Sequence, residues 1–130
     1  TTPLLSKDAF QDKAVILIAE DDDLNRRMLT RMVTVLGYGV ETAGNGKEVL
    51  SILQQKRCSL ILMDNHMPDL DGITTTTIIR KKMRSKIPII GLTGDVFKET
   101  RRKCLDAGMN RFLSKPFRMD ELKDIINQLV

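Results

Sequence analysis

Acidic, hydroxyl and amino side chains follow four separate apolar segments of this chain. In chain order they are Glu20 and Asp21, Asp64, Thr93 and Lys115. Apolar runs of this length, bounded by turn signals, are typical of strands buried on both faces of a parallel sheet. Because open α/β sheets hold their ligands outside the carboxyl ends of the strands, we expect these side chains to converge on one edge.

Carboxylates that converge in this way repel one another. Two charges about 5 Å apart repel by roughly 3 kcal/mol at an effective dielectric near 20, so they raise each other's pKa or recruit a cation. Oxygen ligands without His or Cys select Mg²⁺ or Mn²⁺, and such an ion usually bridges to a phosphoryl oxygen. With the hydroxyl of Thr93 and the ammonium of Lys115, the set predicts phosphoryl transfer with Asp64 as the nucleophile.

Each of these side chains also has an ordinary structural explanation. Thr93 could close a turn, Lys115 could be a solvated surface lysine, and Asp64 could cap the turn after its strand. The acidic run 20–23 could only cap a helix. Their coincidence at four strand ends of one predicted sheet favours the functional interpretation.

Apolar runs and helical spacing alternate along the chain, which predicts a single α/β domain. The predicted strands cover residues 14–19, 38–43, 59–64, 87–92 and 110–114. The predicted helices cover residues 24–36, 48–57, 73–83, 98–107 and 119–129, the first capped by Asp22 or Asp23. Strict alternation predicts a five-stranded, doubly wound parallel sheet in the order 2-1-3-4-5, a flavodoxin-like (βα)5 fold.

Two stretches of the predicted helices need comment. The run 74–77 is all threonine, whose β-branched side chains lower helix propensity. The cations that cluster between Arg80 and Lys86 suit a helix carboxyl end, and we interpret them as a solvated face.

Length and composition bound the class of protein. A chain of 130 residues, 42% hydrophobic and 29% charged, supports one globular core, which we place at residues 14–130 after a polar linker at 1–13. The net charge of +4 lacks interleaved aromatics, so direct nucleic-acid binding is not expected, and no apolar run suggests membrane contact. The isolated Cys58 and Cys104 indicate reduced thiols and a cytoplasmic location. A start at Thr1 without Met is compatible with a piece of a longer protein.

Four motifs give the chain a resemblance to a known family. Residues 16–22, 62–72, 88–94 and 112–117 resemble, in order and spacing, the motifs of the response-regulator receiver domain of two-component signalling. The resemblance covers about residues 14–130. The stretches 24–26 and 108–110 look most like receivers fused to hybrid sensor histidine kinases.

The resemblance implies a role for each acidic residue. Asp64 would accept a phosphoryl group from a phosphohistidine and become an acyl phosphate. Glu20 and Asp21 would hold Mg²⁺ or Mn²⁺, joined by Asp64 and by the backbone carbonyl of His66. The domain would phosphorylate itself and slowly dephosphorylate itself, as part of a hybrid histidine kinase.

The resemblance also implies a conformational switch and a partner. Thr93 and Lys115 would contact the phosphoryl oxygens, Phe112 would be the switch aromatic, and the Lys115–Pro116 bond would be cis. Phe112 has no hydroxyl to donate, and Gly94 replaces the alanine that is frequent after this threonine.

The implied partner is a histidine kinase or a histidine phosphotransfer domain. Its histidine must approach the strand ends closely, so the docking surface must surround the acidic pocket. Leu24, Pro116 and Phe117 would form an apolar part of this surface. Leu24 could equally be a core residue that faces the sheet.

Three other functions remain as alternatives. A magnesium-dependent phosphatase of the aspartyl-nucleophile type needs a second acid at the position of His66. A flavodoxin-like cofactor carrier needs a phosphate-binding loop where this chain has the acidic run 20–23. A degenerate receiver that only binds partners would not need the complete pocket. The cognate kinase, the output module and dimerisation are left open.

Overall fold

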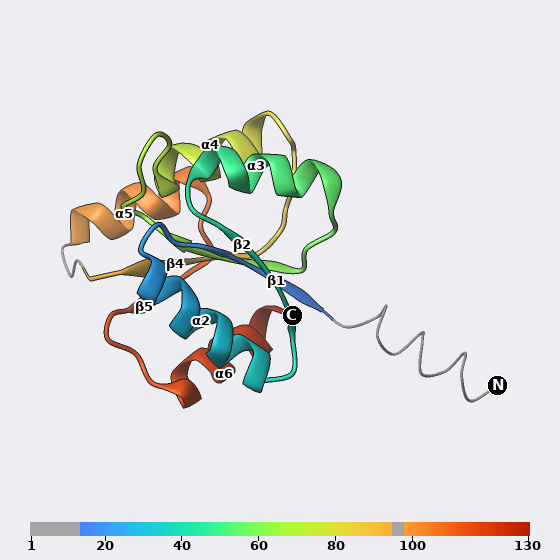
Figure 1. Cartoon of the computed structure of the whole chain (residues 1–130). Coiled ribbons are helices and arrows are strands. Elements are labelled where there is room, and N and C mark those ends of the chain that lie inside the picture. The colour runs from blue at the N-terminus through green and yellow to red at the C-terminus, as the bar shows by residue number, and fades with distance from the viewer. Residues whose placement is uncertain (1–13, 95–97) are drawn as a thin grey trace.

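A computed structural model of the chain describes residues 14–94 and 98–130, in which strands alternate with helices as predicted (Figure 1). The strands are β1 (Val15–Ala19), β2 (Gly39–Ala43), β3 (Leu60–Asp64), β4 (Ile89–Thr93) and β5 (Arg111–Ser114). The helices are α2 (Asp23–Val35), α3 (Gly46–Gln55), α4 (Gly72–Lys81), α5 (Lys98–Ala107) and α6 (Met119–Leu129). The linker predicted at residues 1–13 lies outside the described residues.

The five strands form one parallel sheet in the order β2-β1-β3-β4-β5, which confirms the predicted topology. Within it, β1 lies between β2 and β3, and Ala19 of β1 is opposite Met63 of β3. Glu20, which follows Ala19, and Asp64, which follows Met63, therefore lie side by side at the carboxyl edge. The register of two adjacent strands is thus what pairs the first acidic motif with the second.

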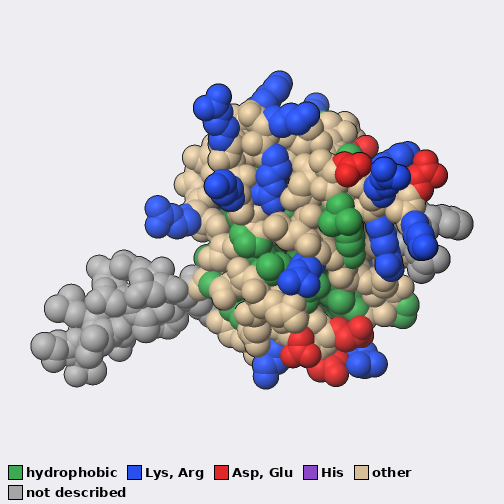
Figure 2. Space-filling view, turned by 180° about the vertical axis from the view of Figure 1, so that it is seen from behind, with side chains coloured by type: hydrophobic (Ala, Val, Ile, Leu, Met, Phe, Trp, Pro, Cys, Tyr) green, Lys and Arg blue, Asp and Glu red, His purple; other side chains and the backbone are tan. Residues whose placement is uncertain are grey.

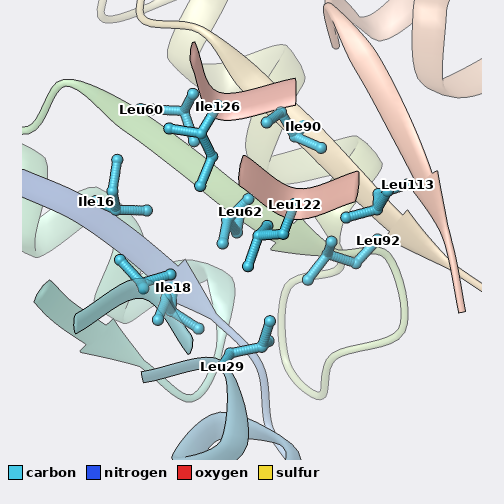
Figure 3. Close-up of a cluster of buried hydrophobic side chains, with 11 residues drawn as sticks. Ile16, Ile18, Leu29, Leu60, Leu62, Ile90, Leu92, Leu113, Leu122 and Ile126 are labelled. Atoms are coloured by element: carbon cyan, nitrogen blue, oxygen red, sulfur yellow. The ribbon is translucent and has the colours of Figure 1, made fainter. Parts of the chain in front are cut away.

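Helices cover both faces of the sheet, with α2 and α6 on one face and α3, α4 and α5 on the other (Figure 1). Successive side chains of a strand point to opposite faces, so Ile16 and Ile18 join one core and Leu17 joins the other. Figure 3 shows the first core, where Leu122 and Ile126 of α6 lie over the side chains of the central strands. The three β1 side chains and the two α6 side chains named here are fully buried, so the sheet that carries the loops at the carboxyl edge is firmly packed.

Two helices begin at side-chain caps, one predicted from the sequence and one not. Asp22 caps α2 by accepting a hydrogen bond from the N–H of Asn25 at 2.9 Å. Asp71 does the same for α4, whose threonine-rich sequence was expected to weaken the helix. The hydroxyls of Thr75 and Thr77 donate to backbone carbonyls one turn back, so these two polar groups are satisfied within the helix.

Some boundaries differ from the prediction by two residues. The second helix begins at Gly46, before the predicted residue 48, because Asn45 caps it by accepting from the N–H of Glu48. The fourth strand begins at Ile89, after the predicted residue 87. Pro88 has no N–H to donate to the ladder, although its carbonyl accepts from Ile61 at 2.9 Å.

The interpretation of the cationic cluster as a solvated face was wrong for Arg80. Its guanidinium donates to the carbonyl of Gly108 through both Nε and Nη2, at 3.0 and 2.9 Å, and to the carbonyl of Ser85 at 2.9 Å. Burial lowers the pKa of Arg80 below its ordinary value. This arginine connects α4 to the turn before β5, because its long side chain reaches carbonyls that no helix amide reaches.

The distribution of charged side chains over the surface is consistent with the net charge of +4. Figure 2 shows Lys and Arg side chains spread over the face opposite the view of Figure 1, with acidic side chains among them. Cys58 is half-buried and Cys104 is buried, and the two do not form a disulfide. Among the described residues, no helix combines the length and the apolar character needed to cross a membrane.

Candidate functional site

The strand ends bring the predicted site residues together. Glu20 and Asp64 are buried, with 1% and 5% of their surfaces exposed, and Thr93 ends the neighbouring strand with 3% exposed. The Nζ of Lys115 lies 3.3 Å from Oε1 of Glu20 and 3.6 Å from Oδ1 of Asp64. The N–H of Lys115 also donates to the carbonyl of Thr93 at 2.8 Å, which connects the last two strand ends.

Burial and neighbouring charges act together on the Glu20 carboxyl. Its Oε2 accepts a hydrogen bond from the N–H of Asp22 at 3.2 Å, while its Oε1 faces the ammonium of Lys115. Loss of solvent raises the pKa of Glu20 above its ordinary value, and the Asp64 carboxyl raises it further. The Asp22 N–H and the Lys115 ammonium act in the opposite direction but do not cancel the rise.

The three carboxylates fit a divalent cation. Glu20, Asp21 and Asp64 each offer an oxygen within 4.8 Å of the other two, and Asp21 is exposed, so the group opens to solvent on that side. At this separation each pair repels by roughly 3 kcal/mol at an effective dielectric near 20. Lys115 neutralises one of the three charges, which leaves two. An all-oxygen donor set with this residual charge suits Mg²⁺ or Mn²⁺.

The loop after β3 supplies backbone contacts to Asp64. The N–H of His66 donates to Oδ1 of Asp64 at 3.2 Å, and the His66 side chain is exposed. Gly72 closes the loop, since its N–H donates to the carbonyl of Asn65 at 3.1 Å. A Cβ on Gly72 would lie 2.7 Å from the carbonyl oxygen of Asp64, so only glycine allows this approach. The metal contact of the His66 carbonyl stays a prediction.

Phe112, the predicted switch aromatic, is half-buried on the face that α3, α4 and α5 cover. It lies opposite Gly91 of β4, and a Cβ on Gly91 would lie 3.0 Å from a ring carbon of Phe112. The same Cβ would lie 2.8 Å from the Sδ of Met109. The ring therefore packs where Gly91 leaves room. Sequence reasoning missed this role, although a glycine inside a buried strand is a signal of close packing.

Leu24 is 66% exposed in the first turn of α2, which removes the alternative of a core residue. A cavity of about 340 Å³ lies between α2 and the segment after β5. It is lined by Glu20, Asn25, Met28, Leu29, Met32, Lys115, Pro116 and Phe117. Two of the three predicted docking residues, Pro116 and Phe117, thus line an apolar cavity that adjoins the acidic pocket. The Lys115–Pro116 peptide bond is cis, as expected.

Sequence reasoning missed one arginine at this edge. Arg26, one turn into α2, donates from its Nη1 to the carbonyls of Glu20 at 3.0 Å and Asp21 at 3.3 Å. Its position four residues after Asp22 was visible in the sequence, but side-chain direction was not. Arg26 therefore contacts the backbone of both acids that precede the helix.

Comparison with known proteins identifies a family. The family described as "Response regulator receiver domain" matches residues 16–127. Hybrid signal transduction histidine kinase K of Dictyostelium discoideum is 38% identical over 128 residues, which cover 92% of this chain and 11% of that protein. Sensor histidine kinase RcsC of Escherichia coli K12 is 35% identical over 115 residues, 88% of this chain and 12% of that protein. The chain thus spans about a tenth of the length of these relatives.

Solved structures give the same result. The chemotaxis protein CheY4 of Vibrio cholerae has a TM-score of 0.85 at 28% identity, with 91% of this chain and 99% of that one covered. The receiver domain of sensor histidine kinase PA1611 of Pseudomonas aeruginosa PAO1 has a TM-score of 0.82 at 36% identity, with 90% and 97% covered. That structure is described with a magnesium ion coordinated in its active site cleft.

Proposed function

The chain belongs to the response regulator receiver domain family of two-component systems, and we propose that Asp64 is its phosphoacceptor. The observation that carries the proposal is the placement of a buried carboxylate within 3.6 Å of the Lys115 ammonium, beside two further acids. A hydroxyl group at the end of the neighbouring strand, on Thr93, completes the set.

The reaction follows from these groups. A carboxylate oxygen of Asp64 attacks the phosphorus of a phosphohistidine, the P–N bond breaks, and the imidazole nitrogen leaves with the bonding electron pair. The product is an acyl phosphate on Asp64 and a free histidine. Lys115 and Thr93 donate hydrogen bonds to the phosphoryl oxygens, where charge is spread during transfer.

A Mg²⁺ or Mn²⁺ ion held by Glu20, Asp21, Asp64 and the backbone carbonyl of His66 would offset the charge of the phosphoryl oxygens. The chain's own contribution is to hold the oxygen donors ready. The Asp22 N–H fixes one oxygen of Glu20, and the Lys115 ammonium lies at the other. The acids therefore do not need to reorganise when an incoming phosphoryl group arrives.

We also propose that phosphorylation shifts the populations of a switch at Thr93 and Phe112. Thr93 would move toward the new phosphoryl oxygens and leave room behind it, and the half-buried Phe112 ring would turn further into that room. The surface formed by α5, β5 and α6 would report the change. Fluorine labelling of Phe112 with and without beryllofluoride tests this. A single unchanged environment would contradict the switch.

Receiver domains of hybrid kinases interact with histidine kinase or phosphotransfer domains, and we propose where this chain does so. The exposed Leu24 and the cavity beside Pro116 and Phe117 offer apolar contacts next to the pocket. A helix that carries the phosphohistidine would lie across α2 with its histidine over Asp64. The hybrid-kinase context of the relatives, together with two cysteines that form no disulfide, supports a cytoplasmic role within a longer sensor kinase.

Acetyl phosphate tests the phosphoacceptor. The wild-type chain should take up one phosphoryl group in the presence of Mg²⁺ and none in EDTA, as measured by intact-protein mass spectrometry. Asp64→Asn should abolish uptake with an unchanged circular dichroism spectrum. Asp69→Asn is the matched control, because it makes the same change at an exposed position of the same loop. Normal uptake by Asp64→Asn would refute the assignment.

The alternatives have less support. The residue two positions after Asp64 is the exposed His66 and not the second acid of an aspartyl-nucleophile phosphatase. A partner-binding domain without chemistry would not need a lysine ammonium between two buried carboxylates.

A further inference from the structure

The guanidinium of Arg26 contacts the backbone of both acids that follow β1. Its Nη1 donates to the carbonyl of Glu20 at 3.0 Å and to the carbonyl of Asp21 at 3.3 Å. Its Nη2 donates to Oδ1 of Asp23 at 2.8 Å. The Arg26 side chain is only 26% exposed, because it packs against the loop that carries the two acids.

These two carbonyls precede the helix and cannot be satisfied by its ladder. The N–H of Arg26 folds back to the carbonyl of Asp22 at 2.9 Å, one residue beyond the acid pair. The Glu20 N–H donates to the carbonyl of Ala43 in β2 at 3.0 Å, so the sheet fixes the start of the loop, and the Arg26 side chain holds the two carbonyls that follow. Because a carboxylate is placed by the peptide from which it projects, the same contacts fix where the two metal-facing side chains begin.

We propose that Arg26 is a positioning residue that sets the affinity of the pocket for Mg²⁺ by clamping the backbone of Glu20 and Asp21. The inference rests on the proposed metal site and goes beyond it, since Arg26 touches neither the ion nor the phosphoryl group. Arginine suits this role because its planar fork presents several donors in a fixed geometry, which a lysine ammonium does not.

Charge and geometry predict opposite results for Arg26. A cation close to a cation-binding site repels the incoming ion, so loss of the charge alone would tighten Mg²⁺ binding. Loss of the clamp would weaken it, because the acids would have to be ordered upon binding. Asp23 reduces the charge effect, since it pairs with Arg26 at 2.8 Å. We therefore expect geometry to dominate.

Arg27 is the matched control. It is the next residue of the same helix, and its Nη2 pairs with the other oxygen of Asp23 at 3.1 Å. Its side chain is 78% exposed, against 26% for Arg26, and it is Arg26 that donates to the two loop carbonyls. Arg27→Ala thus removes the same charge from the same surface without removing the clamp.

The experiment is a Mg²⁺ titration of the full chain, in which calorimetry measures the Kd and backbone NMR measures the carbonyl shifts. Arg26→Ala should raise the Kd for Mg²⁺ roughly tenfold, as the loss of one or two net hydrogen bonds implies. Arg26→Lys should give an intermediate Kd, since it keeps the charge but not the fork. Arg27→Ala should leave the Kd unchanged or slightly lower. The ¹³C shifts of the Glu20 and Asp21 carbonyls should move only in the Arg26 variants.

Each other outcome has a distinct meaning. A wild-type Kd in Arg26→Ala, or an equal loss in Arg27→Ala, would overturn the clamp while leaving the metal site intact. Carbonyl shifts that move together with those of the whole spectrum would mean that Arg26 serves only the fold. A wild-type chain that binds no Mg²⁺ would refute the proposed metal site and this inference with it.

Discussion

Asp64→Asn should stabilise the metal-free domain even though it removes the proposed phosphoacceptor. The Asp64 oxygen lies within 4.8 Å of oxygens of Glu20 and Asp21, so two repulsions of roughly 3 kcal/mol each act on it at a dielectric near 20. The Lys115 ammonium at 3.6 Å attracts it by roughly 5 kcal/mol on the same scale. The balance is about 1 to 2 kcal/mol against the charge, before the cost of burying it.

An amide in place of the carboxylate keeps the other contacts of the site. Its oxygen can still accept the N–H of His66, which lies 3.2 Å from Oδ1 in the structure. The charge that remains beside Lys115 is that of Glu20 at 3.3 Å, the better placed of the two partners. We therefore expect the unfolding temperature in EDTA to rise by about 3 to 8 °C, the shift that about 1 to 2 kcal/mol gives a domain of this size.

Differential scanning calorimetry in EDTA and in a Mg²⁺ series measures both effects. Mg²⁺ should stabilise the wild type by mass action on the folded state, and this increment should shrink in Asp64→Asn. Asp69→Asn, in the same loop but exposed, should change neither value. A variant that melts below the wild type in EDTA would mean that the attraction of Lys115 outweighs the repulsion. A full Mg²⁺ response would place the ion elsewhere.

Three further results are expected. Leu24→Ala should slow transfer from a phosphohistidine domain by roughly 5- to 100-fold, because it removes a leucine that would be buried at the interface, and should leave acetyl phosphate uptake unchanged. An equal loss with both donors would contradict a docking role. Gly91→Ala should cost about 1 to 3 kcal/mol and move the Phe112 ring outward in a fluorine spectrum, and an unchanged spectrum would show that Met109 yields instead. Burial and then Glu41 raise the pKa of Cys58, so its alkylation by iodoacetamide should accelerate at a higher pH in the folded than in the urea-unfolded chain, and coincident profiles would refute this.

The sheet order and the strand-end chemistry could be predicted because both depend on sequence periodicity. Short apolar runs that alternate with amphipathic helices predict a doubly wound sheet, and the order 2-1-3-4-5 makes β1 and β3 neighbours. Once these strands are adjacent, Glu20 and Asp64 must meet, whatever the details of packing. The same reasoning could not decide whether Leu24 faces the core, since a helix turn offers both directions. Its 66% exposure needed the structure.

Arg26 and Arg80 show what periodicity could not reveal. Both lie on helices among other cations, at positions where a solvated charge is the usual interpretation, and both donate to loop carbonyls that no helix amide reaches. Arg27 is the same residue type, follows Arg26 directly and pairs with the same Asp23, yet its side chain remains 78% exposed. The two side chains leave α2 in different directions, and only that of Arg26 points toward the loop. This direction depends on how the helix is rotated about its axis against the rest of the fold. A residue type and its spacing predict which groups can reach one another. The backbone decides which of two adjacent arginines contacts the site, so the contrast between Arg26→Ala and Arg27→Ala isolates the contribution of geometry from that of charge.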